Sequence, residues 1–527
     1  MKIAGFCSGH DAAYCILKDG IPEVHNELER FNRVKDAAGD SMQFLFDTYK
    51  FDDVDYFTHC IGSKRDTDEF YKKSFEKCKS LGVWYDTGHH QAHAANAFYS
   101  SNFKEALIVT LDGGGIDEAL QPDGQKTEFR TCFTVWTGLE NKITLQEAWH
   151  YKSLHLGGAW DFCTEKIFGL SSLSPSQQGT VMGMAALGKP RYKDFFSEIQ
   201  NGDRAPSSWK SLREVAKSSE QGMFDIAASL QAATEEAVKI IFDRLIKEFN
   251  PRSICMSGGV SLNCVLTGKL VEWYPGINFF CDPVPYDAGL AIGSARYVYH
   301  DILGMPRIYD NPRNSTSYLG LSYSWDDVHV ELNKRRDKLN YQMSVTDSEV
   351  VDLLAEGDNV ISVYGEGSES GRRALGNRSI LADPRSPKMK DVINEKVKHR
   401  QWFRPFAPSI MREEVKNWFK YDIDSPYMSF AIPFKEEMKD KVPAVVHFDG
   451  TARLQTVSED DNPWYYNFIK KFKEKTGVPI LLNTSFNDRE PIVETPEHAL
   501  NCFSRTNIDY LYFREFGVLV SKKNLGT

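Results

Sequence analysis

Arginine and lysine side chains gather in one stretch of the sequence, residues 371–409. It starts GRRALGNRSILADPR and ends KVKHRQWFRPFAPS, and glycine and proline interrupt it. Because arginine stays charged at any working pH and offers a planar fork to carboxylate or phosphate, the stretch favours a pocket for small anions. The alternative, a solvated face of salt bridges, fits poorly because few acidic residues interleave. The basic residues of this stretch include Arg372, Arg373, Arg378, Arg385, Lys396, Lys398, Arg400 and Arg404.

Two histidines four residues apart, in TGHHQAHAANAFYS, could bind a metal. If this segment is helical, His89 and His93 share a face and His90 points elsewhere. Two imidazoles at this spacing can chelate one divalent ion. Asp287, at an expected helix start in PVPYDAGLAIGSA, is a candidate further ligand. The alternative is a helix that carries histidines without a metal, which is the commoner meaning of an isolated H-x-x-x-H pattern.

Three further turns carry polar residues. In SGHDAA, His10 and Asp11 could act as a general base and its neighbour, or as ordinary polar turn residues. In LDGGG, Asp112 precedes a glycine triplet that could let a phosphate or its Mg²⁺ approach the backbone, or form a flexible turn. In MSGGVSLN, the backbone could hold a ribose and adenine, or Asn263 could cap a helix. No P-loop and no dinucleotide-binding fingerprint occurs.

Strands and helices must position these residues. Apolar runs ending in glycine predict strands at 3–7, 105–111 and 253–257, and AYCILKDG with IPEVHNELER predicts a hairpin. FTVWTGLENKITLQEAWH predicts two further strands, and residues 225–249 have the apolar spacing of an amphipathic helix. After residue 344, a helix, the strand NVISVYGEG, the basic stretch and the strand VPILLNTSFN follow one another.

Length, charge and cysteine content limit the class of protein. A chain of 527 residues is too long for one core, so we expect two domains. The net charge of −10 disfavours a polymeric nucleic acid as partner. The 10 cysteines include no C-x-x-C pair and are interpreted as buried thiols in a reducing compartment. With no signal peptide and no apolar run that could span a bilayer, we expect a cytoplasmic protein without membrane contact.

The whole chain resembles the O-carbamoyltransferase family that modifies nodulation factors and antibiotics such as tobramycin and cephamycin. The resemblance extends over nearly all 527 residues in collinear order. It is carried by SGHDAA, GHHQAHAANAFY, TLDGGG, GTVMGMAALGKP, SLQAATEE, SGGVSLN, YDAGLAIGSA, SGRRALGNRSILADPR, FRPFAPS, DGTARLQTV and NTSFN with PIVETP.

The resemblance implies a mixed α/β fold with two domains. Residues 1–310 would form a metal-binding carbamoyl-transfer domain with an actin/sugar-kinase-like duplicated fold, similar to the tRNA threonylcarbamoyl-transferase domain. Residues 311–343 would connect it to residues 344–527, a domain similar to threonylcarbamoyl-adenylate synthase. The second domain would make carbamoyl-adenylate from carbamoyl phosphate and ATP, and the first would transfer the carbamoyl group to a hydroxyl of a small acceptor.

The resemblance also implies roles for individual residues. His10, Asp11, Arg373, Lys398 and Arg404 would be catalytic, with His10 as the base. The metal ligands would be His89, His93 and Asp287. They would bind one ion, and both Fe and Zn stay open as its identity. Carbamoyl phosphate and ATP with Mg²⁺ would be bound by Arg373, Arg378, Lys398, Arg404, Arg453, Asn483, Ser485 and Asn487. The adenylate would lie against Asp112, Gly113, Gly114, Gly258, Gly259 and Asn263 in the first domain.

Two positions depart from the family pattern. Arg372 stands where the family usually has proline, and Gly179-Thr180-Val181-Met182 replaces a stretch that usually contains lysine.

Two alternative functions stay open beside carbamoyl transfer to a small sugar, nucleoside-like compound or natural product. One is tRNA threonylcarbamoyl-type transfer, which the acidic charge disfavours. The other is a non-catalytic nucleotide-binding protein of actin-like fold. The acceptor and the oligomeric state, with a homodimer as one option, also stay open.

Overall fold

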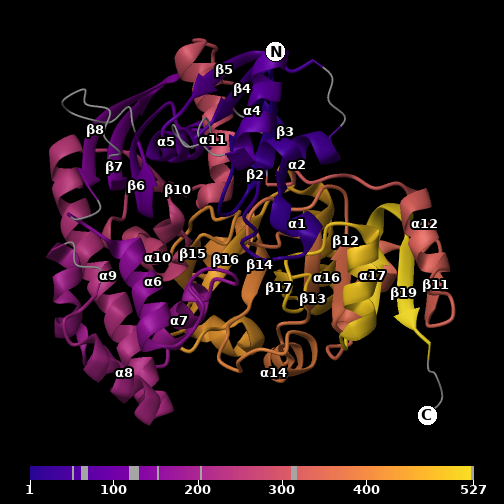
Figure 1. Ribbon diagram of the computed structural model, residues 1–527. Coiled ribbons are helices and arrows are strands. Elements are labelled where there is room, and N and C mark those ends of the chain that lie inside the picture. The colour runs from indigo at the N-terminus through magenta and orange to yellow at the C-terminus, as the bar shows by residue number, and fades with distance from the viewer. Residues whose placement is uncertain are drawn as a thin grey trace. The chain divides into compact units, whose positions relative to one another are not determined.

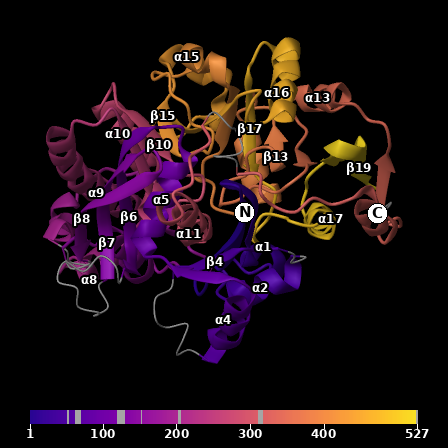
Figure 2. The same cartoon turned by 90° about the horizontal axis from the view of Figure 1, so that it is seen from above.

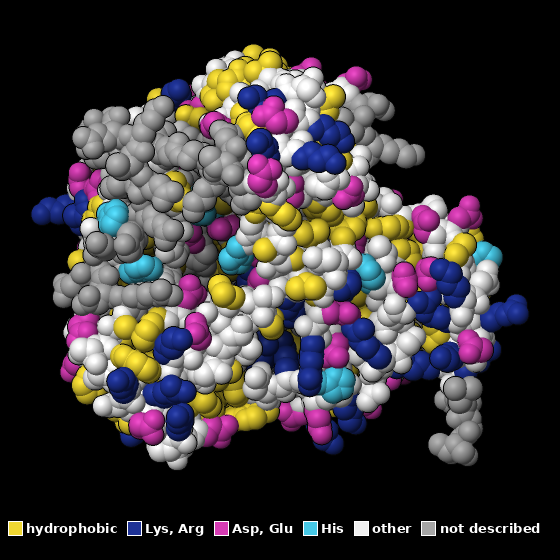
Figure 3. Space-filling model, in the orientation of Figure 1, with side chains coloured by type: hydrophobic (Ala, Val, Ile, Leu, Met, Phe, Trp, Pro, Cys, Tyr) yellow, Lys and Arg dark blue, Asp and Glu magenta, His cyan; other side chains and the backbone are white. Residues whose placement is uncertain are grey.

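A computed structural model describes residues 1–49, 53–60, 69–117, 130–150, 153–201, 205–309 and 317–523 (Figures 1 and 2). The chain divides into two compact units, Met1–Thr316 and Ser317–Thr527. On the face in Figure 3, acidic and basic side chains are interspersed over the described surface. Among the described residues, no helix combines the length and apolar character needed to cross a membrane.

The N-terminal unit contains two five-stranded sheets. The first has the order β3-β2-β1-β4-β5 and the second the order β10-β9-β6-β7-β8. The strands of the first sheet are β1 (Lys2–Cys7), β2 (Ala13–Lys18), β3 (Ile21–Glu27), β4 (Tyr56–His59) and β5 (Val83–Asp86). Those of the second are β6 (Glu105–Ile116), β7 (Arg130–Leu139), β8 (Lys142–His150), β9 (Ser253–Ser257) and β10 (Asn278–Cys281).

The two sheets repeat one topology. In the first, β1 pairs antiparallel with β2 and β2 with β3, while β4 and β5 continue the other side in parallel. In the second, β6, β7 and β8 are the antiparallel part, and β9 and β10 continue in parallel from β6. The same order and directions in both sheets confirm the predicted duplicated, actin-like architecture.

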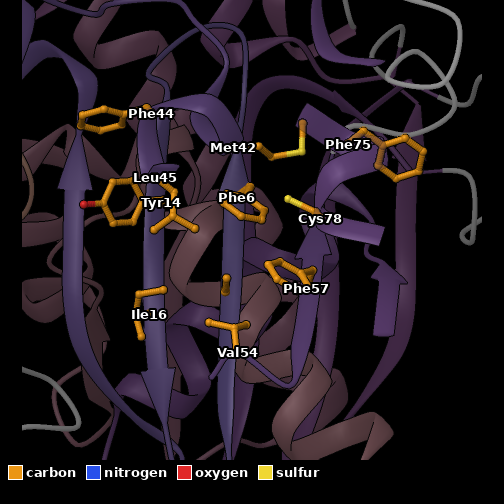
Figure 4. Close-up of a cluster of buried hydrophobic side chains, with 11 residues drawn as sticks. Phe6, Tyr14, Ile16, Met42, Phe44, Leu45, Val54, Phe57, Phe75 and Cys78 are labelled. Atoms are coloured by element: carbon orange, nitrogen blue, oxygen red, sulfur yellow. The ribbon is translucent and has the colours of Figure 1, made fainter. Parts of the chain in front are cut away.

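Helices pack on these sheets and fix the position of the histidine segment. Against the first sheet, a core that includes Phe6, Tyr14 and Phe57 excludes water (Figure 4). A Cβ at Gly293 would lie 1.9 Å from the Ala92 carbonyl oxygen, so the backbones of α11 and α5 approach closely only because residue 293 is glycine. The helices of the unit are α1 (Leu28–Asn32), α2 (Ser41–Thr48), α4 (Glu69–Leu81), α5 (His89–Ser100), α6 (Leu156–Phe162), α7 (Gln178–Ala185), α8 (Trp209–Ser218), α9 (Glu220–Phe249), α10 (Cys264–Trp273) and α11 (Leu290–Tyr297).

The C-terminal unit is built on a nine-stranded mixed sheet of order β11-β19-β18-β12-β13-β17-β14-β16-β15. Its strands are β11 (Leu339–Gln342), β12 (Ile361–Tyr364), β13 (Arg378–Ala382), β14 (Ala407–Met411), β15 (Phe430–Pro433), β16 (Thr451–Val457), β17 (Ile480–Ser485), β18 (Tyr510–Phe513) and β19 (Val518–Lys522). Its helices are α12 (Trp325–Asn333), α13 (Asp347–Ala355), α14 (Met389–Val392), α15 (Val415–Trp418), α16 (Pro463–Thr476) and α17 (Pro496–Arg505).

One expected boundary changes. The sequence predicts residues 311–343 as a connecting segment, but residues 317–343 belong to the C-terminal unit. They include α12 and β11, and β11 pairs antiparallel with β19, so backbone hydrogen bonds tie this stretch into the sheet. Its Pro, Asn and Ser content suggested a linker, because such residues favour turns and loops. They do so equally in a linker and in a segment that joins elements of one domain.

Candidate functional sites in the two units

Two histidines and two aspartates converge in the N-terminal unit. Residues 89–100 are helical, so the condition for a shared face is met and His89 and His93 lie on one face of α5. Nε2 of His89 is 3.0 Å from Oδ2 of Asp112 on β6 and 3.8 Å from Oδ1 of Asp287, which opens a short 3-10 turn. Nε2 of His93 is 4.0 Å and 3.7 Å from the same two oxygens. The four ligand atoms all lie within 4.8 Å of one another.

The main chain around this cluster holds its members in place. Oδ1 of Asp112 accepts a 2.9 Å hydrogen bond from the Gly259 N–H, which leaves Oδ2 facing the histidines. Ser257 Oγ lies 3.3 Å from Nδ1 of His93, so Nε2 of that ring faces the carboxylates. A Cβ at Gly115 would lie 2.1 Å from the His89 ring, so the third glycine of the triplet makes room for this imidazole. Such supporting contacts are typical of ligand sets that must be oriented in advance.

The donor set fits a transition-metal ion. Ligand atoms that are each about 2.1 Å from one ion lie about 3–4 Å apart, which matches the separations within this cluster. Burial disfavours the charged imidazole of His89, but Asp287 and then Asp112 outweigh burial and raise its pKa to about 10. Nε2 of His93 is buried and makes no hydrogen bond within the described residues. The cluster therefore attracts a cation, and imidazole with carboxylate suits Fe and Zn alike.

His90 lies apart from the cluster, as its helical position predicts. Its Nε2 is 2.9 Å from the Thr131 carbonyl oxygen and its Nδ1 is 2.6 Å from Thr110 Oγ1. Since the carbonyl can only accept, Nε2 carries the proton and Nδ1 accepts from the hydroxyl. Burial lowers the pKa of His90 to about 4, so the ring is neutral. His90 thus holds α5 against the second sheet.

Some residues assigned by sequence to the adenylate lie in or around the histidine–aspartate cluster of His89, His93, Asp112 and Asp287. Asp112 is a member of the cluster, and Gly259 binds its carboxylate. Gly258 has φ +91°, and a Cβ there would lie 2.2 Å from the Leu111 carbonyl oxygen, so this turn requires glycine. Asn263 caps α10 by accepting from the Leu266 N–H, and its amide donates to Gln231. The cap that the sequence left as an alternative is therefore present.

The remaining glycines lie at a close backbone contact. Gly114 has φ +133°, a value that favours glycine. A Cβ at Gly157, in α6, would lie 2.6 Å from the Cα of Gly113. The start of the glycine triplet thus approaches α6 closely, an arrangement that side chains would prevent.

His10 and Asp11 form an ion pair in the turn after β1. Nδ1 of His10 is 2.9 Å from Oδ2 of Asp11, whose side chain is buried, while half of the His10 side chain is exposed. A hydrogen bond with Cys60, then burial, and then the charges of Cys60, Asp287 and Asp11 raise the pKa of the Cys7 thiol well above its usual value. Asp287 and Asp11 thus both act on the Cys7 thiol, and the imidazole that Asp11 pairs with is half exposed.

In the C-terminal unit, three arginines converge on the turns before β14 and at β16. Burial and then Arg453 lower the pKa of Arg404 to about 10, and burial, Arg404 and Arg453 lower the pKa of Arg400 well below its usual value. Nε of Arg400 donates to Oδ1 of Asn394 at 2.7 Å, and the amide of Asn394 donates to the Arg404 carbonyl oxygen at 3.1 Å. These side chains are only partly exposed, and close guanidinium groups that repel one another favour a bound anion.

Three other predicted residues form one contact group. Lys398 Nζ donates to Oδ1 of Asn487 at 2.6 Å and to its carbonyl oxygen at 2.8 Å, and it also donates to the Ser485 carbonyl oxygen. Ser485 Oγ donates to Oδ1 of Asn487 at 2.8 Å. The lysine is buried, so these oxygens replace the water that its ammonium loses.

Two buried polar residues hold the loop that carries Arg373. The carboxylate of Glu369, which sequence analysis missed, accepts from the N–H groups of Leu375 and Asn377, each at 2.7 Å, and from that of Arg378. The amide of Asn483 on β17 donates to the Ala374 carbonyl oxygen at 3.1 Å. Asn483 therefore holds the loop at Ala374. Arg373, which is half-buried, lies next to this contact on a loop that hydrogen bonds fix.

Arg378 differs from its predicted place among the anion-binding arginines. It is fully buried on β13, and its guanidinium lies 3.6 Å from the centre of the Tyr364 ring. It donates to the carbonyl oxygens of Gly365, Asn377 and Glu494. Because main-chain carbonyl groups and the Tyr364 ring already contact its guanidinium, Arg378 stabilises the loop before β13 and the nine-stranded sheet.

Each unit contains a match to the model of one of the two domains of a known family. The model of the carbamoyltransferase C-terminus matches residues 351–521, and that of the carbamoyltransferase N-terminus matches residues 192–296. The two matches define a transferase of two different parts. The chain belongs to the carbamoyltransferase family, as its resemblance predicted.

Relatives support this assignment over most of the chain. Nodulation protein NolO of Bradyrhizobium diazoefficiens is 35% identical over 82% of this chain and 79% of its own length. Nodulation protein NolNO of Sinorhizobium fredii is 34% identical over 95% of this chain and 78% of its own length. HypF of T. kodakarensis has 17% identity and a TM-score of 0.37 over 58% of this chain and 48% of its own, so the fold assignment rests on the sheet topology.

Proposed function

We propose that this carbamoyltransferase works in two steps and uses ATP. In the first step, water converts carbamoyl phosphate to carbamate and phosphate, and carbamate attacks the α-phosphate of ATP. The products are carbamoyl-adenylate and pyrophosphate. In the second step, a hydroxyl of a small acceptor takes the carbamoyl group and AMP leaves. The observation that carries this proposal is the pair of clusters of opposite electrostatic character, one in each unit.

The C-terminal unit is assigned the adenylate-forming step. Carbamate and ATP are both anionic, so bringing them together requires fixed positive charge. Arg400, Arg404 and Arg453 supply such charge in one place, and a hydrogen bond to Asn394 holds the guanidinium of Arg400. Arg373, on the loop held by Glu369, is assigned to carbamoyl phosphate. Mg²⁺ would accompany the ATP phosphates.

The N-terminal unit is assigned the transfer step. His89, His93, Asp112 and Asp287 would hold one Fe or Zn ion. When bound, this ion supplies Lewis acidity that polarises a carbonyl or lowers the pKa of a hydroxyl. Because a hydroxyl is a weak nucleophile at neutral pH, the transfer also needs a base, and the exposed imidazole of His10 is assigned that role.

The first test is release of pyrophosphate. We expect the purified chain, with Mg²⁺ and ATP, to release pyrophosphate only when carbamoyl phosphate is added. Release without carbamoyl phosphate, or none with it, would contradict the first step. An acceptor need not be known for this assay, since the adenylate forms before the acceptor reacts.

Single substitutions test the division between the units. Arg404→Ala should lower pyrophosphate release roughly 100-fold or more, because it removes a charge that faces the phosphates. His89→Ala should leave release within about twofold of wild type and stop transfer to the acceptor. Arg412→Ala is the matched control, since this arginine pairs at the surface with Asp422 at 2.7 Å. Equal loss of release in Arg404→Ala and His89→Ala would contradict the two-site scheme.

A further inference from the structure

Two aromatic side chains of the C-terminal unit lie in contact and half exposed. The ring centroids of Trp402 and Phe448 are 5.5 Å apart, and their planes meet at 84°. Each side chain has an exposed fraction of 49%. Single exposed aromatic residues are ordinary, but two that support each other beside charged groups form a surface suited to a flat ligand.

The contact joins the two turns that carry the arginine cluster. Trp402 lies between Arg400 and Arg404, and the amide of Asn394 donates to the carbonyl oxygens of both Trp402 and Arg404. The other turn begins at His447, whose N–H donates to the Thr451 carbonyl oxygen at 2.8 Å. Phe448 lies on this turn, which leads into β16 and Arg453. The aromatic pair therefore lies at the edge of the basic cluster.

The indole of Trp402 is the better platform of the two rings. Lys390 Nζ lies 3.8 Å from the centre of the Phe448 ring, so a cation already occupies one face of that ring. Phe448 in turn packs across Trp402 and limits the orientations that the indole can take. A ring held in this way loses little freedom when a ligand stacks on it.

We propose that Trp402, supported by Phe448, stacks on the nucleobase of the ATP whose phosphates the arginine cluster binds. This inference rests on the proposed function, because it takes ATP as the ligand of that cluster. Stacking on an aromatic side chain stabilises any nucleobase, since every base has a π-face. The platform therefore adds affinity for nucleoside triphosphates over inorganic polyphosphate, and it discriminates little between adenine and guanine.

Comparing the affinity for ATP with that for inorganic tripolyphosphate isolates the contribution of the nucleoside, which only ATP carries. In calorimetric titrations of the full chain with Mg²⁺, Trp402→Leu should weaken ATP binding roughly tenfold and leave tripolyphosphate binding within about twofold. Trp402→Phe should restore most of the ATP affinity. Tyr341→Leu is the matched control, because Tyr341 is 39% exposed on β11 at the far edge of the sheet from β16.

The outcomes separate this inference from the proposed function. Equal weakening of ATP and tripolyphosphate, or no weakening of either, would overturn the role of Trp402 and leave the arginine site intact. If the wild-type chain bound neither ligand, the proposed function would fail and the inference with it. Difference fluorescence between wild type and Trp402→Phe gives a second readout that does not depend on Trp402→Leu folding. ATP should quench the Trp402 emission and tripolyphosphate should not, and equal quenching by both would count against base stacking.

Discussion

The two units hold clusters that are electrostatic opposites. In the N-terminal unit, Asp112 and Asp287 raise the pKa of His89, so the cluster favours a cation. In the C-terminal unit, Arg453 lowers the pKa of Arg404 in addition to the effect of burial, so the cluster favours an anion. Neither arrangement is favourable for folding alone, because like charges held close together and away from water repel. Each is best explained as a site whose ligand supplies the missing charge.

The units also differ in what fixes their side chains. The ligand atoms of the N-terminal cluster come from the starts of helical segments and from a strand, and the surrounding glycines allow the backbone to approach them. The arginines assigned to anions in the C-terminal unit lie mostly on turns. Buried Glu369 holds the loop of Arg373, and buried Asn394 holds the turn of Arg400 and Arg404. Replacing one ligating side chain should therefore disturb the N-terminal site only locally. Replacing a supporting side chain in the C-terminal unit should disturb the whole loop or turn that it holds.

The largest effect is expected for His93→Ala. A ligand contributes directly to metal binding, so its loss should lower metal affinity more than the roughly 10–100-fold that supporting residues contribute. Elemental analysis of the purified protein should give about one Fe or Zn per wild-type chain and almost none for the variant. His10→Ala, which changes none of the four candidate ligands, should retain the metal. Metal retained in His93→Ala would remove this histidine from the ligand set.

Glu369→Ala tests the support of the arginine-bearing loop. It leaves the N–H groups of Leu375, Asn377 and Arg378 without their acceptor, which should cost about 3 kcal/mol of the free energy of unfolding. Glu366→Ala, at an exposed position on the same loop, should change that free energy by less than about 0.5 kcal/mol. Urea unfolding of the full chain measures both. A loss in Glu369→Ala as small as that of the control would contradict the supporting role.

Ligands of opposite charge should stabilise different units. At about 30 times its dissociation constant, a ligand that binds only the folded state stabilises it by about 2 kcal/mol. Hydrogen exchange should therefore slow in α5 and β6 on adding Fe²⁺ or Zn²⁺, and in the turns before β14 and β16 on adding tripolyphosphate. Protection of the same segments by both ligands would show that the clusters do not act as separate sites.

Much of the fold and part of the sites could be predicted from the sequence. Apolar periodicity and turn residues predict the hairpin β2–β3, the helix α9 and the strands that end at the glycine turns. The spacing of His89 and His93 predicts a shared helix face, because that relation depends only on local geometry. Asp112 was assigned differently, since an acid before three glycines is typical of a phosphate-binding turn. That its carboxylate faces α5 depends on where the second sheet lies.

Residues that support a site through long-range contacts were harder to predict. Glu369 sits in an ordinary loop, and only the path of the folded chain brings three N–H groups to its carboxylate. Arg378 stands among other arginines, so sequence alone gave it the same role, although its side chain is buried on Tyr364. Composition indicates which charges are present, whereas burial and the neighbouring carbonyl groups decide which of them face a ligand.

The smallest expected effect compares one histidine in each unit, His300 and His447, whose pKa values are both lowered. Burial lowers the pKa of His300 to about 3 and that of His447 to about 4, so both rings stay neutral in the folded protein. In the unfolded chain both take up a proton below about pH 6.5, so stability is present above that pH and is lost as the pH falls towards the folded pKa. Each histidine should cost about 1 kcal/mol between pH 7 and pH 5.5.

His300→Gln and His447→Gln separate the two contributions. Each variant should flatten the pH dependence of the unfolding free energy by about 1 kcal/mol over that interval, measured by urea unfolding at pH 7 and pH 5.5. The reason is that glutamine cannot take up a proton in either state. A pH dependence as steep as that of wild type in His300→Gln would mean that this ring is protonated in the folded unit. That result would contradict its burial against Tyr99 and the hydrogen bond that it donates to the Met305 carbonyl oxygen.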